Sequence, residues 1–292
     1  MKLSWLNEVQ RRPRRVAVGE FDGVHLGHRE VIGGADTVLT FEPHPRTVIA
    51  PEAAPKLLTP LTVKQDLIAA LGVEELVLIP FDKSFARQSA QEFVDGVLVD
   101  ALAASHVSVG ENFRFGHRAS GDVAMLTAQT GFATRVVPLV EAGGEIVSSS
   151  HIRGLLLGGA VGQAADFLGR PYEMRGSVVH GDHRGRDLGY PTANIVPDDR
   201  LVCPGHGVYA CRANGMPAAV NVGVRPTFAT GRGVLVEAYL IDWEGDLYDQ
   251  EVRVEFLRRL RGERAFNSVD ALIEQMATDV EQARLVVADW LD

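Results

Sequence analysis

Val16-Ala-Val-Gly-Glu-Phe-Asp-Gly-Val-His-Leu-Gly-His28 is the run with the strongest structural signal in the chain. Residues 16–21 are predicted to form a short buried strand, Gly23 permits a sharp turn, and His25 and His28 lie three residues apart at the start of a predicted helix. A helix N-terminus offers unpaired backbone N–H groups and the positive end of the helix dipole, both of which favour an anion. The two imidazoles would complete a phosphate site, and the run therefore predicts nucleotide chemistry.

Length and composition limit the classes of protein that the chain can represent. With 292 residues the chain is long for one domain, and two domains are expected. A formal net charge of −9 argues against a nucleic-acid partner, because such proteins usually carry a basic face. Cys203 and Cys211 are too few for a disulfide framework, and they lack the spacing of a zinc site. Met1–Arg15 does not resemble a signal peptide and no stretch is long enough to span a bilayer, so we expect a cytoplasmic protein without membrane partners.

The lysines restrict how phosphate can be handled. The sequence holds only Lys2, Lys56, Lys64 and Lys83, and it has no Gly-x4-Gly-Lys-Ser/Thr pattern. A Walker-type loop or a protein-kinase site requires a lysine on the phosphates. Phosphoryl transfer in the second half must therefore use arginine, histidine, backbone N–H groups and a metal ion.

The first half alternates apolar strands with helical stretches, which is typical of a parallel α/β sheet. Its predicted strands are Val16–Phe21, Thr37–Phe41, Glu75–Pro80, Val107–Val109 and Thr134–Pro138, and its predicted helices are Thr62–Leu71, Ala90–Leu102 and Asp122–Thr130. The first crossover is short, and Gly33-Gly34 is expected to end a helix of barely two turns. Ligands of such sheets bind at the carboxyl ends of the strands, where residues 22–28 fall.

Beyond an alanine-rich helical segment at 161–168, the pattern changes to short apolar runs separated by glycine, proline and aspartate. These runs are Ser177–Val179, Val208–Arg212, Ala218–Val222, Leu235–Ile241 and Val252–Phe256. They predict a small antiparallel β-barrel. Residues 268–288 predict a terminal amphipathic helix with Ser268 as its N-cap, and with one apolar face formed by Leu272, Ile273, Met276, Val280 and Ala283. We expect domains at 1–170 and 171–292.

Two short motifs carry chemistry in the first domain, and each has a simpler alternative. His25 and His28 favour phosphate binding, although two histidines this close also occur by coincidence. Zinc fits less well, because at least one further ligand is missing. Ser148-Ser-Ser-His-Ile-Arg153 supplies hydroxyls and an arginine that can hold a polyphosphate, and the alternative is a serine-rich helix cap followed by a surface arginine.

Taken together, these motifs resemble those of the nucleotidyltransferase superfamily, in which they hold ATP phosphates from opposite sides. Gly19–His28, Thr40-Phe-Glu-Pro-His-Pro45 and Gly110-Glu-Asn-Phe-Arg-Phe-Gly116 resemble the adenylyltransferase half of bacterial bifunctional riboflavin kinase/FAD synthetases. The resemblance implies a Rossmann-like nucleotidyltransferase domain in which His28 and Arg153 are catalytic. The ATP-binding residues that it implies are Gly19, Phe21, Asp22, His25, His28, Asn112, Ser149, Ser150 and Arg153.

The second half is similar to the riboflavin kinases of the same family. The matching stretches are Gly185-Arg-Asp-Leu-Gly-Tyr-Pro-Thr-Ala-Asn194, Asn221-Val-Gly-Val-Arg-Pro-Thr-Phe228, Glu237 with Asp242, and Gly245-Asp-Leu-Tyr248. The resemblance implies that Glu237 is the base for the riboflavin 5′-hydroxyl and that Thr192 and Asn194 bind Mg²⁺ and ATP. It also implies that Gly176, Gly181 and Gly185 shape the loop over the phosphates, and that Arg261, Glu263 and Phe266 lie on the flavin side.

The expected activity is therefore the conversion of riboflavin to FMN and of FMN to FAD, with ATP as co-substrate and Mg²⁺ as cofactor. Glu20, His151 and Asp249 depart from the family pattern, and the short crossover lies beside the predicted ATP site. The short crossover and His151 leave open a monofunctional riboflavin kinase with an impaired N-terminal domain. A flavin-nucleotide-binding protein without turnover and a class I aminoacyl-tRNA synthetase are further alternatives, and the acidic charge disfavours the synthetase. The oligomeric state is not predicted.

Overall fold

The computed structural model describes residues 1–180, 190–224 and 234–290. The chain forms two compact units, Met1–Ser149 and Ser150–Asp292. In the sequence, the division between the units precedes the functional boundary predicted near residue 170. Helix α7 (Val161–Leu168) counts with the second unit because it packs on strands of that unit. The functional boundary itself stays a prediction.

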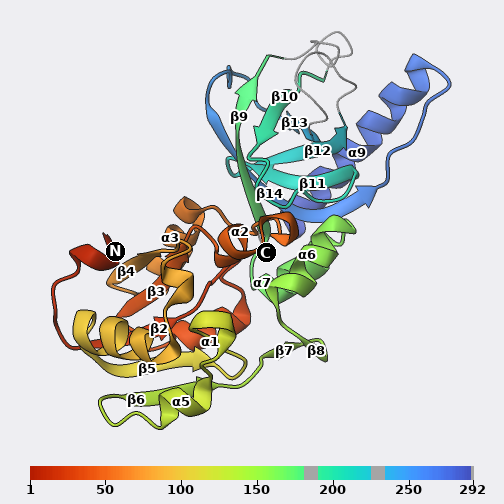
Figure 1. Ribbon diagram of the computed structural model, residues 1–292. Coiled ribbons are helices and arrows are strands. Elements are labelled where there is room, and N and C mark those ends of the chain that lie inside the picture. Colours follow the sequence, from red (N-terminus) through yellow and green to blue (C-terminus); the bar gives the residue numbers. More distant parts are fainter. Residues whose placement is uncertain (181–189, 225–233, 291–292) are drawn as a thin grey trace. The chain divides into compact units, whose positions relative to one another are not determined.

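The first unit is built on a parallel sheet, as predicted (Figure 1). Its strand order is β1-β4-β3-β2-β5-β6. The strands are β1 (Lys2–Trp5), β2 (Arg14–Val18), β3 (Thr37–Glu42), β4 (Glu75–Pro80), β5 (Ala104–Gly110) and β6 (Ala133–Val137). A small antiparallel hairpin, β7 (Glu141–Ala142) and β8 (Glu145–Ile146), follows the sheet.

Helices cover both faces of this sheet and confirm the predicted α/β class. They are α1 (Leu26–Ile32), α2 (Pro45–Ile49), α3 (Leu61–Ala69), α4 (Ala90–Glu92), which continues as the π-helix η4 (Phe93–Ala101), and α5 (Val123–Thr127). Short 3₁₀ turns form η1 (Leu6–Glu8), η2 (Pro51–Ala53), η3 (Phe85–Arg87) and η5 (His117–Ala119). The expected helix stretches at 62–71, 90–102 and 122–130 all coincide with helices.

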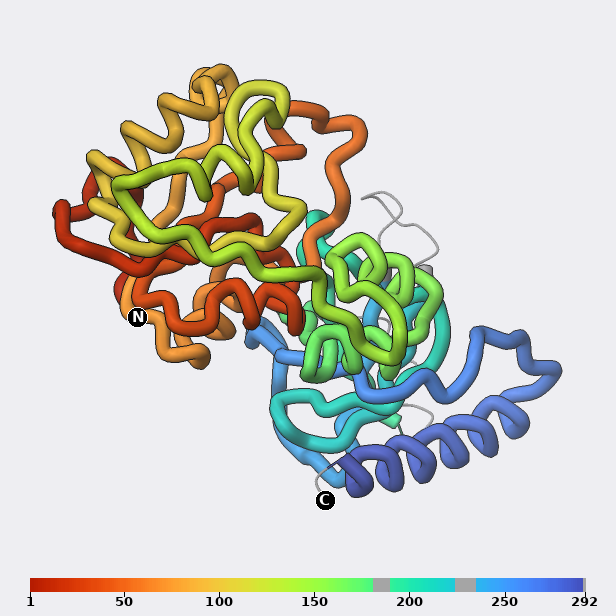
Figure 2. The backbone as a smooth tube through the Cα atoms, turned by 90° about the horizontal axis from the view of Figure 1, so that it is seen from below, coloured from red at the N-terminus to blue at the C-terminus, as the bar shows by residue number. Residues whose placement is uncertain are grey.

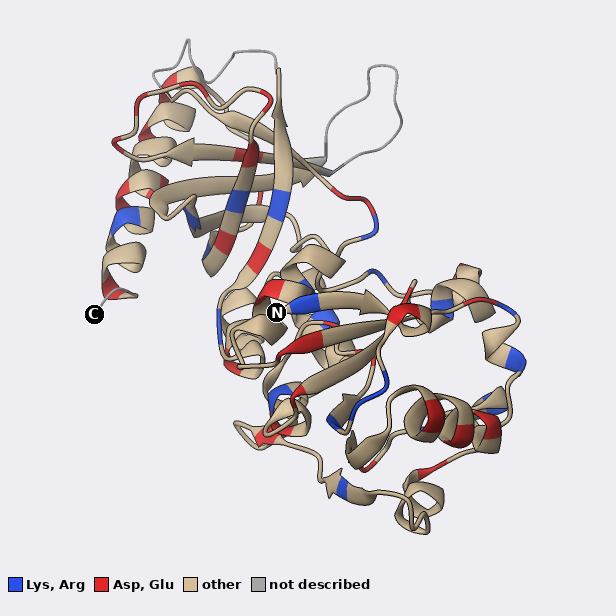
Figure 3. Cartoon of the chain, turned by 90° about the vertical axis from the view of Figure 1, so that its left-hand side faces the viewer, with Lys and Arg blue, Asp and Glu red and all other residues tan. Residues whose placement is uncertain are grey.

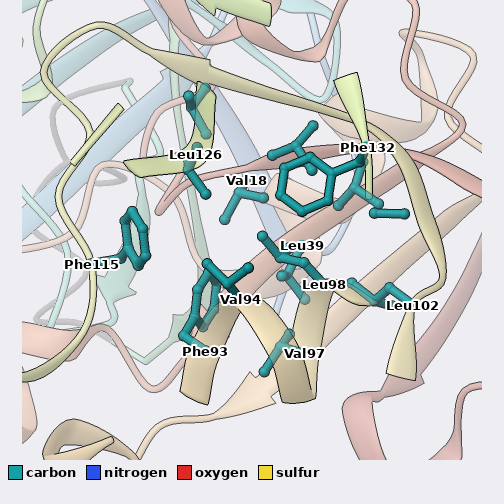
Figure 4. Packing of buried hydrophobic residues seen from close by; sticks show 14 of the residues in the cluster. Val18, Leu39, Phe93, Val94, Val97, Leu98, Leu102, Phe115, Leu126 and Phe132 are labelled. Atoms are coloured by element: carbon teal, nitrogen blue, oxygen red, sulfur yellow. The ribbon is translucent and has the colours of Figure 1, made fainter. Parts of the chain in front are cut away.

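Side chains alternate between two hydrophobic cores along each strand, as the period of two in a strand requires. Val16 and Val18 face the core formed with η4 and α5, where Phe93, Leu98 and Leu126 pack (Figure 4). Ala17 lies on the other face, in the core formed with α1 and α3. Both faces of the sheet are therefore buried, which explains the nearly continuous apolar character of the predicted strands.

The structure differs from the expectation at the beginning of the sheet. Strand β2 ends at Val18 and not at Phe21, because Phe21 has a φ of 50° and leaves the extended conformation. Strand β1 was not predicted, since it is a short edge strand in which only Ser4 is buried. The short first crossover is confirmed. Helix α1 has seven residues and is capped at Gly33, and Gly34 follows with a φ of 82° that favours glycine.

The second unit contains helix α6 (Ser149–Leu157), whose first residue belongs to the first unit, together with α7, a barrel and a terminal helix. The barrel is closed in the order β10-β13-β12-β11-β14-β9 and antiparallel, as predicted. Its strands are β9 (Tyr172–Val179), β10 (Ala193–Pro197), β11 (Gly207–Ala213), β12 (Met216–Val224), β13 (Val234–Leu240) and β14 (Glu251–Arg261). Within the described ranges, no helix is long and apolar enough to cross a membrane.

The terminal helix α9 (Val269–Asp289) packs against β11, β12 and β14 and has Ser268 as its N-cap, as predicted. Its contact with the barrel is made by the last turns, where Val280 and Ala283 join Val286 and Val287 in a core. The first turns extend past the strands (Figures 1 and 2). Leu272, Ile273 and Met276 of those turns are only half-buried, so the predicted apolar face packs along part of its length.

Ion pairs link the neighbouring barrel strands β9, β14 and β11. Figure 3 shows the acidic and basic positions of the barrel strands in red and blue. Glu173 lies between Arg175, at 2.6 Å, and Arg253, at 2.8 Å. Arg253 also contacts Glu255, which pairs with Arg212 at 3.0 Å. Arg212 lies directly opposite Glu255 on the neighbouring strand. Between β9 and β14 the directly opposite residues carry like charges, Arg175 with Arg253 and Glu173 with Glu255, so the ion pairs there run diagonally between the strands.

A buried ion pair lies where β2, β4 and β1 begin. Arg14 is 1% exposed, and its guanidinium donates to Glu75 Oε2 at 3.2 Å and to the Leu102 carbonyl oxygen at 3.2 Å. The Ser4 hydroxyl donates to Glu75 Oε1 at 2.8 Å. The burial of Glu75 acts to raise the pKa of its carboxyl, but the hydrogen bonds from Ser4 and Arg14 and the arginine charge lower it overall. The pair therefore joins three strands through charge-assisted hydrogen bonds.

Replacing Arg14 with leucine should destabilise the first unit by about 3–5 kcal/mol, because it leaves the Glu75 carboxylate buried without its main cation. Denaturant unfolding of the full chain at neutral pH measures this change. The control is Arg12→Leu, which removes a half-exposed cation near the same carboxylate and should cost roughly 1 kcal/mol or less. Equal losses in the two variants would contradict the assignment.

The depressed pKa of Glu75 also predicts a pH dependence. The folded state holds this proton less tightly than the unfolded chain, so the stabilisation is complete above the unfolded pKa and is lost as the pH falls through the folded pKa. The free energy of unfolding of the native chain should decline on acidification below about pH 4.5. Glu75→Gln should be less stable at neutral pH and should show a shallower decline, whereas the exposed Glu74→Gln should behave as the native chain.

Candidate functional site

The first candidate site is the loop that leads from β2 into α1. His25 is the N-cap of α1, and its Nδ1 accepts a hydrogen bond from the backbone N–H of His28 at 3.2 Å. The two imidazole rings stack, with centroids 3.5 Å apart and planes 17° apart. Because Nδ1 of His25 accepts this bond, we assign its ring proton to Nε2. The cap therefore fixes the orientation of the His25 ring, on which the His28 ring stacks, and it makes Nε2 the donor nitrogen of His25.

Phe21 occupies the centre of this loop and is 1% exposed. Its ring meets the His28 ring edge-on, with centroids 5.4 Å apart. A Cβ at Gly19 would lie 3.0 Å from the Phe21 ring, so only glycine fits there without displacing the ring. Gly19 and Phe21 thus shape the histidine pair by packing.

Asp22 fastens the loop to a distant segment. Its carboxylate is 2% exposed and accepts hydrogen bonds from the backbone N–H of Leu58 at 2.9 Å and of Thr59 at 3.1 Å. The hydroxyl of Thr59 accepts in turn from the Gly23 N–H at 3.1 Å. Ser149 donates its hydroxyl to the Asp22 carbonyl oxygen at 2.9 Å. The structure therefore brings Gly19, Phe21, Asp22, His25, His28 and Ser149 together.

Three further predicted residues lie on other elements. Asn112 follows β5, and its Oδ1 lies 3.5 Å from where a Cβ of Gly110 would stand, so the amide folds back over the carboxyl end of that strand. Strand β5 pairs with β2, which leads into the histidine loop. Ser150 and Arg153 lie in the first turns of α6, within the second unit. His151 of the same helix packs its ring against Phe167 of α7, with centroids 4.8 Å apart.

Two ionisable residues that were not predicted as site residues, Lys64 and Glu20, are joined at the start of the loop by the bond from the Lys64 Nζ to the Glu20 carbonyl oxygen. The Lys64 ammonium of α3 is buried, and burial lowers its pKa, while the carboxylates of Asp22, Glu42 and Glu20 act in the opposite direction. Partial burial acts to raise the pKa of Glu20, but its hydrogen bond to His44 and the neighbouring cations lower it overall. The His44 Nε2 lies 2.8 Å from the Glu20 carboxylate.

The second candidate site lies on the barrel. Strand register pairs Asn194 of β10 with Glu237 of β13, and Glu237 with Asn221 of β12. Paired residues of antiparallel strands project from the same face, so the three side chains form one row. The Asn221 amide donates to Glu237 Oε2 at 3.2 Å. Asn221 was part of a quoted motif without a predicted role, and only the strand register reveals its contact with Glu237.

This polar row lies on the outer face of the barrel. The next row, formed by Val178, Ile195, Val236 and Val222, is at most 2% exposed and fills the interior. Tyr239 of β13 projects from the same face as Glu237, and it packs toward α9. Its ring also contacts Tyr190, with centroids 5.2 Å apart. Tyr190 precedes Thr192 by two residues, so this contact holds the segment entering β10 against β13.

The predicted phosphate-loop glycines have different outcomes. Gly176 is not in a loop but within β9, where a Cβ would approach the Ile195 side chain and the Val196 carbonyl oxygen to 2.6 Å. The close packing of β9 on β10 therefore requires glycine. Gly181 and Gly185 lie outside the described residues. Asp249, which departs from the pattern of the resembled family, has a φ of 60°, a left-handed conformation that favours glycine.

The three residues expected on the flavin side make contacts of their own. Arg261 forms a bidentate ion pair with Asp279 of α9, with a shortest distance of 2.8 Å. The Phe266 ring lies 5.7 Å from the Arg261 guanidinium carbon. A Cβ at Gly223 would lie 2.6 Å from the Glu263 carboxylate, which places Glu263 beside the strand that carries Asn221.

Comparison with known proteins supports the division suggested by these two sites. A FAD synthetase family model matches residues 7–151, and a riboflavin kinase model matches residues 168–287. The chain is also similar over its length to a crystal structure described as a macrolide-efflux protein from Streptococcus pneumoniae. The TM-score is 0.89 at 32% sequence identity, and the match covers 97% of this chain and 99% of that chain.

Relatives with assigned activities match nearly the whole chain. The bifunctional riboflavin kinase/FMN adenylyltransferase of Listeria monocytogenes is 36% identical, covering 95% of this chain and 93% of that protein. The protein of the same description from Bacillus subtilis is 37% identical, covering 92% and 90%. That from Escherichia coli K12 is 37% identical, covering 92% and 91%. The chain therefore belongs to the family of bifunctional riboflavin kinase/FMN adenylyltransferases.

Proposed function

We propose that this chain phosphorylates riboflavin with ATP to give FMN, and then transfers the adenylyl group of a second ATP to FMN to give FAD and pyrophosphate. We assign adenylyl transfer to residues 1–170 and the kinase reaction to residues 171–292. The observation that carries the proposal is the presence of two different polar constellations, the stacked His25–His28 pair and the Asn194–Glu237–Asn221 row. We further propose a cytoplasmic location, where ATP is supplied.

In the kinase reaction, the Glu237 carboxylate would accept the proton of the riboflavin 5′-hydroxyl as its oxygen attacks the γ-phosphorus of ATP. The bond from Asn221 holds one carboxylate oxygen in place and leaves the other oxygen to face the substrate. A general base must lie within hydrogen-bonding reach of the proton that it accepts, and the bond from Asn221 supports this role by restricting the carboxylate.

The side chains beside Glu237 fit a magnesium ion. Asn194 of β10 offers an amide oxygen, and Thr192, directly before the strand, offers a hydroxyl oxygen. Mg²⁺ prefers such hard oxygen donors together with substrate phosphates. We propose that these two residues hold Mg²⁺ with ATP. The bound ion would neutralise charge on the phosphates, while Glu237 handles the proton.

In adenylyl transfer, the FMN phosphate attacks the α-phosphorus of ATP and pyrophosphate leaves. The nucleophile is already anionic, so the protein must position the reactants and neutralise charge rather than remove a proton. His25 and His28 would donate to the phosphate oxygens, with Ser149, Ser150 and Arg153 as further ligands. Gly19, Phe21 and Asp22 would support this site by shaping the loop, and Asn112 would contact the phosphates.

A time course tests the proposal directly. A mixture of the purified chain with riboflavin, ATP and Mg²⁺ should form FMN first and FAD later. Chromatography of samples taken over time measures both products. FMN supplied without riboflavin should give FAD at once. FAD formation from FMN separates the bifunctional enzyme from a monofunctional kinase, and ATP consumption separates an enzyme from a binding protein. A folded chain that forms no FMN at any enzyme concentration would refute the kinase assignment.

Single substitutions should separate the two reactions. Glu237→Ala removes the base and should lower FMN formation roughly 10²–10⁴-fold, while conversion of FMN to FAD stays within about twofold of the native rate. His28→Ala should lower FAD formation by roughly 10²-fold or more and leave FMN formation unchanged. Glu251→Ala, on an exposed barrel position, and His106→Ala, on an exposed sheet position, are the matched controls. Loss of both reactions in either folded variant would refute the division of roles.

A further inference from the structure

Lys64 connects helix α3 to the histidine loop, the segment 19–25 between β2 and α1. Its side chain is 7% exposed, and its Nζ donates to the Glu20 carbonyl oxygen at 2.9 Å. The same oxygen accepts a hydrogen bond from the Thr40 hydroxyl of β3 at 3.1 Å. One backbone carbonyl thus receives two buried donors, one from a helix and one from a strand.

The Glu20 carbonyl belongs to the peptide that enters Phe21, and Phe21 has a φ of 50°. This left-handed conformation is a clear outlier for a bulky residue, and it persists only where the surroundings determine it fully. The Gly19 N–H bonds to the Leu39 carbonyl oxygen at 3.2 Å, so the backbone is also held two peptide units earlier. Lys64 and Thr40 therefore fix the plane of the peptide from which the strained residue departs.

The position of Phe21 in turn determines what His28 contacts. The Phe21 ring meets the His28 ring edge-on, and His28 stacks on His25. An unbroken series of contacts therefore runs from the Lys64 ammonium through the Glu20 carbonyl and the Phe21 ring to the imidazole pair.

A second function for Lys64 could be to balance charge, since the carboxylates of Asp22, Glu42 and Glu20 act on its ammonium. Other contacts already occupy two of them. Asp22 accepts backbone N–H groups of Leu58 and Thr59, and Glu20 contacts His44 at 2.8 Å. The directional bond to the Glu20 carbonyl is what distinguishes Lys64 from a mere counter-ion.

We propose that Lys64 is a positioning residue for adenylyl transfer, which holds the Glu20–Phe21 peptide in the strained conformation that orients His28. The inference rests on the proposed adenylyl transfer at the histidine pair. Lys64 touches neither reactant in this assignment and acts through Phe21.

Lys64→Met keeps the length and apolar stem of the side chain and removes the donor. It should lower kcat for FAD formation from FMN roughly 10–100-fold, the loss expected when a reacting group is displaced by about an ångström. The riboflavin kinase rate of the same preparation should stay within about twofold and serves as the internal control. Lys83→Met, at an exposed lysine, should leave both rates unchanged.

A double-mutant cycle with Phe21→Leu tests the route of the effect. Because Lys64 acts through Phe21, the double variant should be no more than about twofold slower than the slower single variant. Losses that multiply would show that Lys64 acts independently of Phe21, for example by charge balance, and would overturn the proposal. An unchanged FAD rate in Lys64→Met would overturn it as well.

If Lys64→Met does not fold, Thr40→Val gives the decision, since it removes the other donor to the same carbonyl at nearly constant volume. Thr40→Val should lower the rate of FAD formation severalfold. Combined with Phe21→Leu, it should cause no further loss beyond about twofold. An unchanged rate of FAD formation, or losses that multiply in the double variant, would refute the proposal.

The imidazole resonances of His28 supply a readout that is independent of activity. They should shift in Lys64→Met, or in Thr40→Val where that variant is used, and not in Lys83→Met. If the native chain forms no FAD, the proposed function fails, whereas these resonances still decide whether Lys64 positions His28.

Discussion

The buried Asp22 carboxylate, held by the backbone N–H groups of Leu58 and Thr59, is the constraint on which the first unit depends. It allows the chain to reverse direction immediately after β2, through Phe21, Gly23 and Val24, which all have positive φ values. The reversal places a seven-residue helix directly after the turn. A loop with this much backbone strain persists because its carboxylate, its carbonyl and the following N–H are each held by a different hydrogen bond. The short crossover is thus compatible with an ordered histidine pair.

The two candidate sites are built in different ways. The histidine pair depends on a strained loop at the carboxyl edge of a parallel sheet, where ligands of such folds commonly bind. The Glu237 row depends on strand register, which fixes Asn194 and Asn221 on either side of the carboxylate. A one-residue slip of either neighbouring strand would move the partner side chain to the opposite face. Loop strain therefore supports one site and sheet pairing the other.

Much of this arrangement could be predicted from the sequence, because its signals are local. Glu75–Pro80 is a strand with the predicted limits, and Ser268 is the N-cap that its position before an apolar periodicity indicated. The remainder depends on contacts between distant segments. No local pattern shows that Lys64 reaches the carbonyl of Glu20, or that Asn221 reaches Glu237. The end of β2 was wrong by three residues because Phe21, a strong strand former, is forced by tertiary contacts into a left-handed conformation.

The alternation of rows around the barrel has a consequence for how such an enzyme can change. The valine and isoleucine row that closes the barrel and the polar row with Glu237 occupy opposite faces of the same strands. Substitutions in the first row change the packing of the barrel interior and therefore its stability. Substitutions in the second row change the polar groups around Glu237 and leave the interior packing as it is. Successive residues of one strand therefore serve stability and chemistry in turn, because they lie on opposite faces of the sheet.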